Sequence, residues 1–542
     1  MVLKTLTVAL AQQEFAVGDI PGNTEKVLLV AQQAMDAGAR VVVYPELTLT
    51  GYPPEDLLLR ASLTTRVDQA IAALCNARLP VYLVVGYPFR QGDLLFNRMA
   101  VIFEGKLLCT YDKQHLPNYQ VFDERRYFTP GDTTCVVDID GFSCGLTICE
   151  DIWFDQPALD ARAAGADVLL NINGSPYHMG RDGQRRERVA AVAQATSLAI
   201  VYVNHVYGQD ELVFDGGSMA ADARGIQHNS PVFTGSLDVI DLVKSDQGVQ
   251  ISRGTPRPVL EPLDEVYQAL KRGLKDYVNR NGFPGVVLGL SGGIDSGLSL
   301  AIAVDALGKD RVHAVMMPFA YTSQMSVDDA RTEADALGVQ YTELPIADLY
   351  HASLETLSPV LKDLPPDVTE QNLQARIRGL LLMAISNKTG YMVLTTGNKS
   401  EMAVGYATLY GDMCGGYNVL KDVPKMLVFE LSRHRNLEAP VIPQRVIDRP
   451  PSAELAPDQK DDDSLPPYEI LDAIIQAYVE SDLSAEAIVA MGFDKDVVYR
   501  VIGLIDRSEY KRQQAPEGVR ITPRGFGRDR RYPITHGWKP GI

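Results

Sequence analysis

Near the middle of the chain, serine, glycine and aspartate stand together in a pattern that suits phosphate binding. Over residues 286–302, an apolar run typical of a buried strand is followed by a Ser-Gly-Gly turn and by apolar residues at helical spacing. Unpaired N–H groups at the start of a helix bind phosphate, and glycines let the ligand approach the backbone. Asp295 adds a carboxylate for a Mg²⁺ ion that bridges phosphate oxygens. The alternative is a tight turn without a ligand.

This loop differs from two common phosphate-binding motifs. No Gly-Lys-Ser/Thr follows it, as in a Walker A loop, and its glycines lack the spacing of a dinucleotide fingerprint. The run Ser291-Gly292-Gly293-Ile294-Asp295-Ser296 resembles instead the SGGxDS loop of the ATP pyrophosphatases. Those enzymes split ATP between its α- and β-phosphates and use the AMP half to activate a carboxyl or carbonyl group.

A second group of reactive residues lies in the first half of the chain. Glu46, Lys113 and Cys149 each come shortly after an apolar run that predicts a strand. Each alone is weak evidence, since such residues are usually solvated or packed. Together they form a complete set for nucleophilic catalysis by a thiol. A thiol with a pKa of about 8.5 needs a base in order to react at neutral pH. Glu46 can take the thiol proton and Lys113 can stabilise an oxyanion.

In order and in local context, this set resembles the Glu-Lys-Cys triad of the nitrilase superfamily, whose members hydrolyse carbon–nitrogen bonds. The resemblance covers about the first 240 residues. It implies that Glu46 is the general base, Lys113 the oxyanion stabiliser and Cys149 the nucleophile. Glu124 matches an additional glutamate that many relatives place beside the triad.

Two polar stretches accompany the phosphate loop in the second half. Asn372 and Arg376 lie four residues apart in a predicted helix over 370–387, where they can meet a ligand or remain solvated. Thr396 and Glu401 follow a predicted strand over 392–395, at the edge where open α/β sheets bind ligands. Together with the phosphate loop and Tyr410-Gly411-Asp412, these stretches resemble the NAD synthetases.

A nitrilase-like glutaminase followed by such a domain is the arrangement of the glutamine-dependent NAD synthetases, so the resemblance spans essentially the whole chain. It implies a ligase that amidates deamido-NAD with ammonia from glutamine and yields NAD, AMP, pyrophosphate and glutamate. A thioester on Cys149 and an adenylated nicotinate carboxyl are the implied intermediates. The resemblance also implies an internal ammonia tunnel and a homo-oligomer built around a synthetase-domain dimer.

The same resemblance implies the binding residues for glutamine, ATP, deamido-NAD and Mg²⁺. Relatives often carry lysine where this chain has Arg181, so a cation is kept but its geometry differs. Single-domain relatives also carry a lysine at the position of Leu409. The implied contacts are glutamine with Tyr119, Ser175 and Arg181; ATP with Gly289, Leu290, Ser291, Gly292, Gly293, Ile294, Asp295, Ser296 and Thr396; deamido-NAD with Asn372, Glu401 and Lys511; and Mg²⁺ with Asp295 and Glu401.

The elements that must position these residues form two α/β domains. Strand-like runs alternate with amphipathic helices up to about residue 243, which predicts a layered domain and, by the nitrilase resemblance, an αββα sandwich. The second half predicts a doubly wound parallel sheet of the Rossmann-like, ATP-pyrophosphatase kind. We place the glutaminase domain at 1–245, a proline-rich linker at 246–262 and the synthetase domain at 263–542.

Composition narrows the class of protein. The chain has 542 residues and a net charge of −18, which favours two or three domains and argues against non-specific nucleic-acid binding. No apolar run approaches a membrane span. The six cysteines form no CxxC pair, which predicts a reducing cytoplasm without a disulfide framework or zinc site. Apart from Cys149, we expect the cysteines only to pack: Cys75, Cys109, Cys135, Cys144 and Cys414.

Some alternatives stay open at this stage. The segment 454–468 is either a solvated loop or a cover over the ATP site. The protein could be another amidotransferase of the ATP-pyrophosphatase class, although the Asn372 and Glu401 motifs speak against this. It could also be a binding or scaffold protein whose amidase half only regulates, although the intact Glu46, Lys113 and Cys149 set argues against that function.

Overall fold

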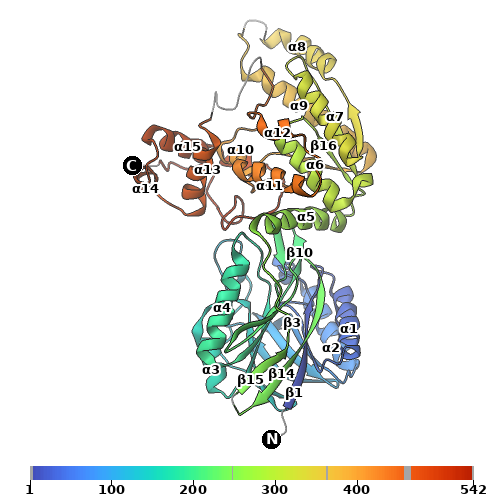
Figure 1. The fold of residues 1–542 in the computed structure, drawn as a ribbon, viewed down its shortest axis with the longest axis vertical. Helices are drawn as coiled ribbons and strands as arrows, with labels where there is room; N and C mark the ends of the chain where they lie inside the picture. Colours follow the sequence, from blue (N-terminus) through green and yellow to red (C-terminus); the bar gives the residue numbers. More distant parts are fainter. Residues whose placement is uncertain (1–3, 247, 362–363, 457–464, 540–542) are drawn as a thin grey trace. The chain divides into compact units, whose positions relative to one another are not determined.

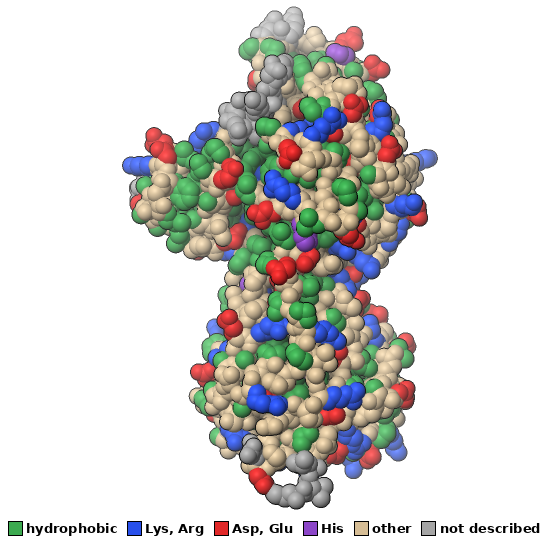
Figure 2. Space-filling model, viewed as in Figure 1, with side chains coloured by type: hydrophobic (Ala, Val, Ile, Leu, Met, Phe, Trp, Pro, Cys, Tyr) green, Lys and Arg blue, Asp and Glu red, His purple; other side chains and the backbone are tan. Residues whose placement is uncertain are grey.

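The computed structural model describes residues 4–246, 248–361, 364–456 and 465–539. The chain divides into two compact units, one of residues 1–207 and 213–260 and the other of residues 208–212 and 261–542. On the face drawn in Figure 2, basic and acidic side chains are interspersed over both units. Among the described residues, no helix has the length and apolar character needed to span a membrane.

The first unit packs two sheets face to face. The seven-stranded sheet has the order β15-β14-β1-β2-β3-β4-β5, and the six-stranded sheet has the order β13-β12-β9-β8-β7-β6. The strands of the first are β1 (Lys4–Gln12), β2 (Val41–Val43), β3 (Tyr82–Gln91), β4 (Leu94–Phe103), β5 (Lys106–Asp112), β14 (Ser236–Ser245) and β15 (Gly248–Arg253). Those of the second are β6 (Val136–Ile139), β7 (Phe142–Ile148), β8 (Val168–Asn173), β9 (Ala199–Asn204), β12 (Met219–Asp222) and β13 (Gly225–Asn229).

Helices cover the outer faces of the two sheets. Figure 1 shows α1 (Ile20–Asp36) and α2 (Ala61–Asn76) on one side of the unit, and α3 (Asp155–Ala163) and α4 (Arg181–Thr196) on the other. Alternate apolar side chains of both sheets form the core between them, and a second core lies between the six-stranded sheet, α3 and α4. A short hairpin pairs β10 (Val206–Gln209) with β11 (Leu212–Asp215), and its central residues 208–212 belong to the second unit. The predicted αββα sandwich is confirmed.

Parallel pairing decides where the reactive residues of this unit gather. Strand β2 pairs in parallel with β1 and β3, and β7, β8 and β9 pair in parallel with one another. Within each sheet the carboxyl ends of the parallel strands meet at one edge. The Glu46 N–H donates to the Asn173 carbonyl over 3.3 Å, which joins the end of β2 in one sheet to the end of β8 in the other. Glu46, Cys149 and Ser175 follow β2, β7 and β8, respectively.

The second unit contains a five-stranded parallel sheet in the order β18-β17-β16-β19-β20. The chain leaves the central strand β16 toward β17 and returns on its other side as β19, which creates a switch point where ligands bind in such folds. The strands are β16 (Val286–Gly289), β17 (Val312–Met316), β18 (Gln340–Glu343), β19 (Met392–Thr395) and β20 (Tyr417–Asn418). This confirms the predicted doubly wound sheet.

The helices of the second unit form two groups, one around this sheet and one near the C-terminus. The first group is α5 (Pro262–Arg280), α6 (Ile294–Leu307), α7 (Gln324–Leu337), α8 (Ala347–Leu361), α9 (Val368–Thr389), α10 (Lys399–Val404), α11 (Lys425–Glu438) and α12 (Gln444–Asp448). The second group forms a separate small core near the C-terminus and contains α13 (Tyr468–Ile475), α14 (Ala485–Ala490), α15 (Lys495–Arg507) and α16 (Glu509–Arg512). Figure 1 shows both groups.

Helix α9 differs from the expectation drawn from its periodicity. The spacing of apolar residues predicts that five residues face the core: Leu373, Ile377, Leu380, Leu381 and Ala384. Ile377 is buried, and Leu373 and Leu381 pack against the core, as predicted. Leu380, however, is 63% exposed, and Ala384 is also exposed. Gln374 is buried instead, because its amide donates to the Leu455 carbonyl, and Gly379 packs against a neighbouring loop. Tertiary contacts with loops therefore set the orientation of this helix. In the segment 246–262, which we predict to be a linker, residues 248–253 form strand β15.

Candidate active sites

The chain turns sharply at Cys149, where strand β7 ends and a short 3₁₀ helix over Cys149–Trp153 begins. The φ angle of Cys149 is 44°, in the left-handed region that residues other than glycine rarely adopt. Its side chain is only 4% exposed. Such a strained position at a strand-to-helix turn is typical of a functional residue held by its surroundings.

The carboxylate of Glu46 accepts hydrogen bonds from three buried groups. Asn97 Nδ2 donates to its Oε1 over 2.7 Å, and the backbone N–H of Gly174 donates to its Oε2 over 2.7 Å. Lys113 Nζ also donates to Oε1 over 2.7 Å. Since the Glu46 side chain is fully buried, these donors fix the orientation of its carboxylate.

Lys113 lies between two buried carboxylates. Its Nζ contacts Glu46 Oε1 at 2.7 Å and Glu124 Oε1 at 2.8 Å, and the Glu124 carboxylate accepts a further hydrogen bond from Tyr52. Burial works against the charge of Lys113, but Glu124 and Glu46 outweigh it and raise the pKa of the ammonium. Burial, partly offset by Lys113, raises the pKa of Glu124 to about 7. The site thus holds a permanent cation beside Glu46.

The thiol of Cys149 needs this arrangement in order to react. Burial raises its pKa well above the usual range, Glu46 raises it further, and Lys113 lowers it. The thiol is therefore protonated near neutral pH, and a nucleophile forms only when a base accepts its proton. Glu46 is the carboxylate that acts most strongly on Cys149. The structure brings together Glu46, Lys113 and Cys149 as the sequence predicts.

Of the residues expected to contact glutamine, Tyr119 lines a pocket, whereas Ser175 and Arg181 do not. Tyr119 donates to both carboxylate oxygens of Glu150, over 2.9 Å and 3.0 Å, and these two residues help to line the pocket. Arg181 stacks on the Trp153 ring at 4.3 Å and acts electrostatically on Tyr119 and Cys149. The buried Ser175 lies outside the pocket lining, as does Arg181, and its hydroxyl accepts from Arg185 Nε.

Sequence reasoning missed Glu150, although it directly follows the nucleophile. It is 7% exposed, and burial raises the pKa of its carboxyl while Tyr119 lowers it. A carboxylate in this position can bind a ligand ammonium, whereas Arg181 can bind a ligand carboxylate. Its position directly after Cys149 is the signal that could have identified Glu150 from the sequence.

In the second unit, the phosphate loop joins β16 to α6. Ser296 Oγ lies 3.0 Å from Ser291 Oγ, accepts from the Ser291 N–H and donates to the Gly293 carbonyl, so the two serines close the turn. Gly292 has φ 77°, and a Cβ atom there would lie 2.2 Å from the Ser326 carbonyl oxygen. Arg449 donates to the Gly292 carbonyl and to Ser326 Oγ. The loop is thus closely packed against α7.

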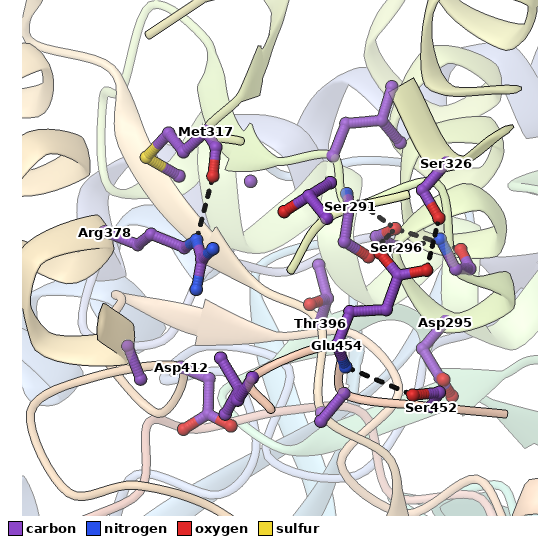
Figure 3. A pocket seen from close by; sticks show the side chains of 18 of the residues that line it. Ser291, Asp295, Ser296, Met317, Ser326, Arg378, Thr396, Asp412, Ser452 and Glu454 are labelled. Carbon is purple, nitrogen blue, oxygen red and sulfur yellow. Dashed lines mark hydrogen bonds between the residues drawn. The ribbon is translucent and has the colours of Figure 1, made fainter. Parts of the chain in front are cut away.

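The loop forms one wall of a cavity of about 620 Å³, shown in Figure 3. Every residue from Gly289 to Ser296 except Gly292 lines the cavity, as do Thr396 and Glu401. The structure therefore collects the residues expected to bind ATP at the switch point of the sheet. A cavity of this size, with phosphate-binding N–H groups, suits a nucleotide.

A lysine stands between the two carboxylates expected to bind Mg²⁺. Lys425 Nζ lies 2.5 Å from Asp295 Oδ2 and 3.6 Å from Glu401 Oε1, and Asn398 Nδ2 donates to Asp295 Oδ1 over 2.8 Å. Lys425 begins α11 and is 1% exposed. Lys425 was not predicted from the sequence, because it lies 130 positions from Asp295 and belongs to no recognised motif.

The donor set fits Mg²⁺. Carboxylate oxygens beside a phosphate loop are its usual protein ligands, and it takes the remaining ligands from substrate phosphates and water. The described residues include no group of three or more His, Cys, Asp or Glu side chains that could hold a metal. Asp295 and Glu401 would therefore bind the ion together with a bound nucleotide.

Two further charged residues line the cavity and were not assigned from the sequence. Arg378 donates from Nε to the Met317 carbonyl over 3.0 Å, and burial lowers its pKa to about 10. Glu454 accepts hydrogen bonds from Ser323 and Ser326, which stand at the N-terminus of α7 (Figure 3). Glu454 belongs to the segment interpreted as a loop or a cover, of which residues 457–464 lie outside the described residues.

The residues expected to contact deamido-NAD divide into two groups. Glu401 lines the cavity, but Asn372 and Lys511 do not. Asn372 accepts from Thr408, and Lys511 donates to the carbonyls of Gly405 and Ala407, each over 2.7 Å. Both thus hold the 405–412 loop, which contributes Tyr406, Gly411 and Asp412 to the cavity. Arg376 binds the same loop through the Leu409 carbonyl.

Known proteins resemble the chain over its whole length. Two family models match it, Carbon-nitrogen hydrolase over residues 7–229 and NAD synthase over residues 266–515. The glutamine-dependent NAD(+) synthetase of Acinetobacter baylyi is 46% identical over 542 residues, covering 99% of this chain and 100% of that protein. The protein of the same name from Thermotoga maritima is 44% identical over 575 residues, covering 99% and 100%.

Solved structures agree with these matches. The glutamine-dependent NAD+ synthetase from Acinetobacter baumannii, in complex with ADP, has a TM-score of 0.81 at 46% identity and covers 99% of this chain and 100% of its own. The glutamine-dependent NAD(+) synthetase from Cytophaga hutchinsonii has a TM-score of 0.85 at 20% identity, covering 99% and 98%. At 20% identity, this similarity shows a shared fold and nothing more.

Proposed function

The chain belongs to the glutamine-dependent NAD(+) synthetases, ligases of class EC 6.3.5.1, and from this membership we propose how its two sites divide the reaction. The first unit releases ammonia from glutamine, and the second uses ATP to amidate deamido-NAD. The buried Glu46–Lys113–Glu124 network beside Cys149 is the observation that carries the first half of this proposal.

In the first unit, Cys149 attacks the side-chain amide carbon of glutamine while Glu46 accepts the thiol proton. Lys113 donates a hydrogen bond to the oxyanion that develops, and Glu46 returns the proton to the departing ammonia. A thioester on Cys149 remains, and water activated by Glu46 hydrolyses it to glutamate. Glu124 also binds the Lys113 ammonium, at 2.8 Å, so that the lysine keeps its position through both steps.

Charge complementarity explains how this site selects glutamine. The carboxylate of Glu150, held by Tyr119, binds the α-ammonium group, and the Arg181 guanidinium binds the α-carboxylate. Ser175 supports the side-chain end near Cys149, where Arg185 orients its hydroxyl. A substrate that lacks either charge leaves one of the two groups without a partner.

In the second unit, the phosphate loop binds the phosphates of ATP through the backbone N–H groups of residues 289–296. Asp295 and Glu401 would hold Mg²⁺, which would supply positive charge next to the phosphates and so favour the departure of pyrophosphate. Lys425 then acts as a second cation, which interacts with both carboxylates and with the phosphates. The ADP bound to the Acinetobacter baumannii relative supports a nucleotide in this fold.

The nicotinate carboxylate of deamido-NAD attacks the α-phosphate, forms an adenylated carboxyl and expels pyrophosphate. This activation is necessary because an ionised carboxylate is a poor electrophile, whereas AMP is a good leaving group. Ammonia then displaces AMP to give the amide of NAD. We assign deamido-NAD contacts to Glu401 directly and to Asn372 and Lys511 through the 405–412 loop that they hold. We also propose that the chain forms a homo-oligomer through a synthetase-domain dimer.

Isotope transfer tests the adenylate step. Deamido-NAD labelled with ¹⁸O in its nicotinate carboxylate is incubated with enzyme, ATP, Mg²⁺ and an ammonium salt. Adenylation predicts one ¹⁸O atom in each AMP, because the carboxylate oxygen leaves with the phosphate. Label in inorganic phosphate, together with ADP as a product, would show acyl-phosphate formation instead and would overturn the proposal.

A further inference from the structure

The helix that carries Lys425 begins without a cap of its own. Helix α11 starts at Lys425, directly after Pro424, whose side chain offers no acceptor to the first backbone N–H groups. Such N–H groups have no partner within the helix and need acceptors from elsewhere. Lys425 is only 1% exposed, so these acceptors must come from the protein. The groups that supply them therefore determine where Lys425 lies.

A carboxylate of helix α13 supplies them. The Met426 N–H donates to Asp472 Oδ2 over 2.9 Å. The Lys425 N–H donates to Ser400 Oγ over 2.9 Å, and this hydroxyl in turn donates to Asp472 Oδ1. A negative charge at the N-terminus of a helix also interacts favourably with the helix dipole. Asp472 thus caps α11, directly through one oxygen and by way of Ser400 through the other.

The same carboxylate binds the helix that carries Glu401. Ser400 and Glu401 are neighbours in the first turn of α10, and the Ser400 side chain is fully buried. Since the Ser400 hydroxyl donates to Asp472, the first turns of α10 and α11 are held by one side chain. These two turns carry Glu401 and Lys425, whose charged atoms lie 3.6 Å apart.

A second residue of α13 contacts the lysine side chain. Lys425 Nζ lies 5.3 Å from the centroid of the Tyr468 ring, within the range of a cation–π interaction. Tyr468 stands four residues before Asp472, so the two side chains lie on one face of α13. Tyr468 is only 5% exposed, which strengthens an electrostatic contact. Helix α13 therefore holds both the backbone and the ammonium group of Lys425.

Helix α13 is itself fixed by the small core near the C-terminus. Its Leu471 and Ile474 side chains are fully buried there, and Ala403 and Val404 of α10 belong to the same core. Met426 of α11 packs against this core as well. Because α13 packs against both α10 and α11, its contacts can transmit a fixed position to both helices.

We propose that Asp472 and Tyr468 are positioning residues of the nucleotide site, which fix Lys425 between Asp295 and Glu401 so that its ammonium group can bind nucleotide phosphates. The effect on the nucleotide rests on the function proposed above. Lys425 lines the cavity beside the phosphate loop, whereas Tyr468 and Asp472 do not. Both residues therefore act through Lys425 and not by touching the nucleotide.

Binding of a nucleotide that the enzyme cannot cleave tests the proposal without turnover. The analogue α,β-methylene-ATP is titrated into the full-length protein at saturating Mg²⁺ in a calorimeter, which measures Kd and the number of sites separately. In Asp472→Asn an amide with one acceptor oxygen replaces a carboxylate with two, so one of the two donors loses its acceptor. We expect Kd to rise about tenfold, because a displaced Lys425 loses a charge-assisted hydrogen bond to the phosphates.

A double-mutant cycle shows whether Asp472 acts through Lys425. Lys425→Ala should itself weaken binding, and the addition of Asp472→Asn should then change Kd less than about twofold. Ser400→Ala removes the bridging hydroxyl and should also raise Kd, by at least about threefold, which keeps the test available if Asp472→Asn does not fold. A tenfold effect of Asp472→Asn that persists in the Lys425→Ala background would overturn the positioning role.

Two substitutions of Tyr468 test the cation–π contact. Tyr468→Leu removes the aromatic ring and should raise Kd about fivefold. Tyr468→Phe keeps the ring over Lys425 and should raise Kd clearly less. Equal effects of the two substitutions would overturn the part of the proposal that concerns Tyr468.

Asp506→Asn is the matched control within the same small core. Asp506 is a buried carboxylate of α15 that binds Tyr478 and Arg530. Its substitution should lower stability, because a buried ion pair is broken, but it should leave Kd for the analogue unchanged. A rise in Kd as large as that of Asp472→Asn would show that any damage to this core loosens the site, and it would overturn the specific role of Asp472.

The same titrations separate two kinds of failure. If wild type binds no α,β-methylene-ATP, the proposed function of the second unit fails. If wild type binds the analogue and Asp472→Asn only lowers the number of sites while Kd stays unchanged, the residue merely supports the fold, and the inference is wrong.

Discussion

The two units prepare their reactive groups in different ways. In the first, Glu46 and Lys113 are fully buried and Cys149 nearly so, and short hydrogen bonds among side chains of the chain itself complete the site. In the second, Asp295, Glu401 and Arg378 line a cavity, and a lysine stands between the carboxylates. The first site is organised before its substrate arrives. By our proposal, the second is completed only when nucleotide phosphates and a metal ion bind.

This difference has a physical basis. Amide hydrolysis needs a nucleophile, a base and an oxyanion donor, all of which amino acids supply. Adenylation gathers several phosphate charges in one place, and among the described residues that line the cavity the cations Arg378, Lys425 and Arg449 stand beside four carboxylates. Substitutions in the first site should therefore abolish one half-reaction cleanly, whereas those in the second should alter its dependence on ATP and Mg²⁺.

The largest effect is expected for Lys113→Ala. Removal of the oxyanion donor should lower glutaminase kcat by about 100- to 1000-fold, while ammonium-driven NAD formation keeps its rate. Glutamate release and NAD formation, measured in parallel, check this. Lys399→Ala alters another fully buried lysine, which lies in the second unit, and serves as the comparison. A glutaminase rate within threefold of wild type for Lys113→Ala would contradict the assigned role.

Asp295→Asn should have the next largest effect, on the second site only. We expect kcat/KM for ATP to fall about 100-fold with either nitrogen source and the Mg²⁺ requirement to rise, because one of two carboxylate ligands is lost. Titration with Mg²⁺ at saturating ATP measures this. Asp305→Asn changes a carboxylate of the same helix that pairs with Arg435, and it should leave the metal requirement unchanged. An unaltered Mg²⁺ titration in Asp295→Asn would refute the metal assignment.

A pair of glycine substitutions tests whether the phosphate loop is as closely packed as the structure shows. In Gly292→Ala the new Cβ meets the Ser326 carbonyl at 2.2 Å in a left-handed backbone, so KM for ATP should rise about tenfold. Gly293 has φ −90° and only the Ser291 hydroxyl nearby, at 3.2 Å. Gly293→Ala should therefore change KM less than about threefold. Equal effects of the two substitutions would show that the loop reshapes freely.

The smallest effect on catalysis is expected for Glu333→Gln, which instead alters stability. Burial raises the pKa of Glu333 from 4.5 to about 8, and its Oε1 has no hydrogen-bond partner among the described residues. The folded state then binds the proton more tightly than the unfolded state, so stability falls as pH rises through this window. Glutamine mimics the neutral acid. It should leave stability at pH 4 unchanged and raise it by up to about 5 kcal/mol at pH 9.

Chemical denaturation at these two pH values measures the effect. If the difference in unfolding free energy between wild type and Glu333→Gln is the same at both pH values, the raised pKa of Glu333 is contradicted.

Local sequence predicted the parts of the sites that depend on strand ends. Glu46, Cys149 and the 291–296 loop each follow a strand, so parallel pairing alone brings them to the right edge. Residues that enter from distant segments could not be found in this way. Lys425 meets Asp295 from 130 positions away, and Glu454 reaches Ser326 from 128.

Helix α9 shows a second limit. Its apolar spacing predicts a single buried face, but loops packed against the helix bury Gln374 and leave Leu380 exposed. For the same reason Asn372 and Arg376 bind the 405–412 loop, whereas Arg378 on another face lines the cavity. Periodicity located the helix, and tertiary contacts decided what each face meets.

The most direct test of the division of labour is NAD formation by wild type and Cys149→Ala from deamido-NAD, ATP and Mg²⁺, with either glutamine or an ammonium salt. We predict that the variant loses glutamine-driven synthesis and keeps the ammonium-driven rate of wild type. Loss of both reactions in a folded variant would show that Cys149 also serves the synthetase site. Retention of glutamine-driven synthesis would show that another residue releases the ammonia, and either result would contradict the account.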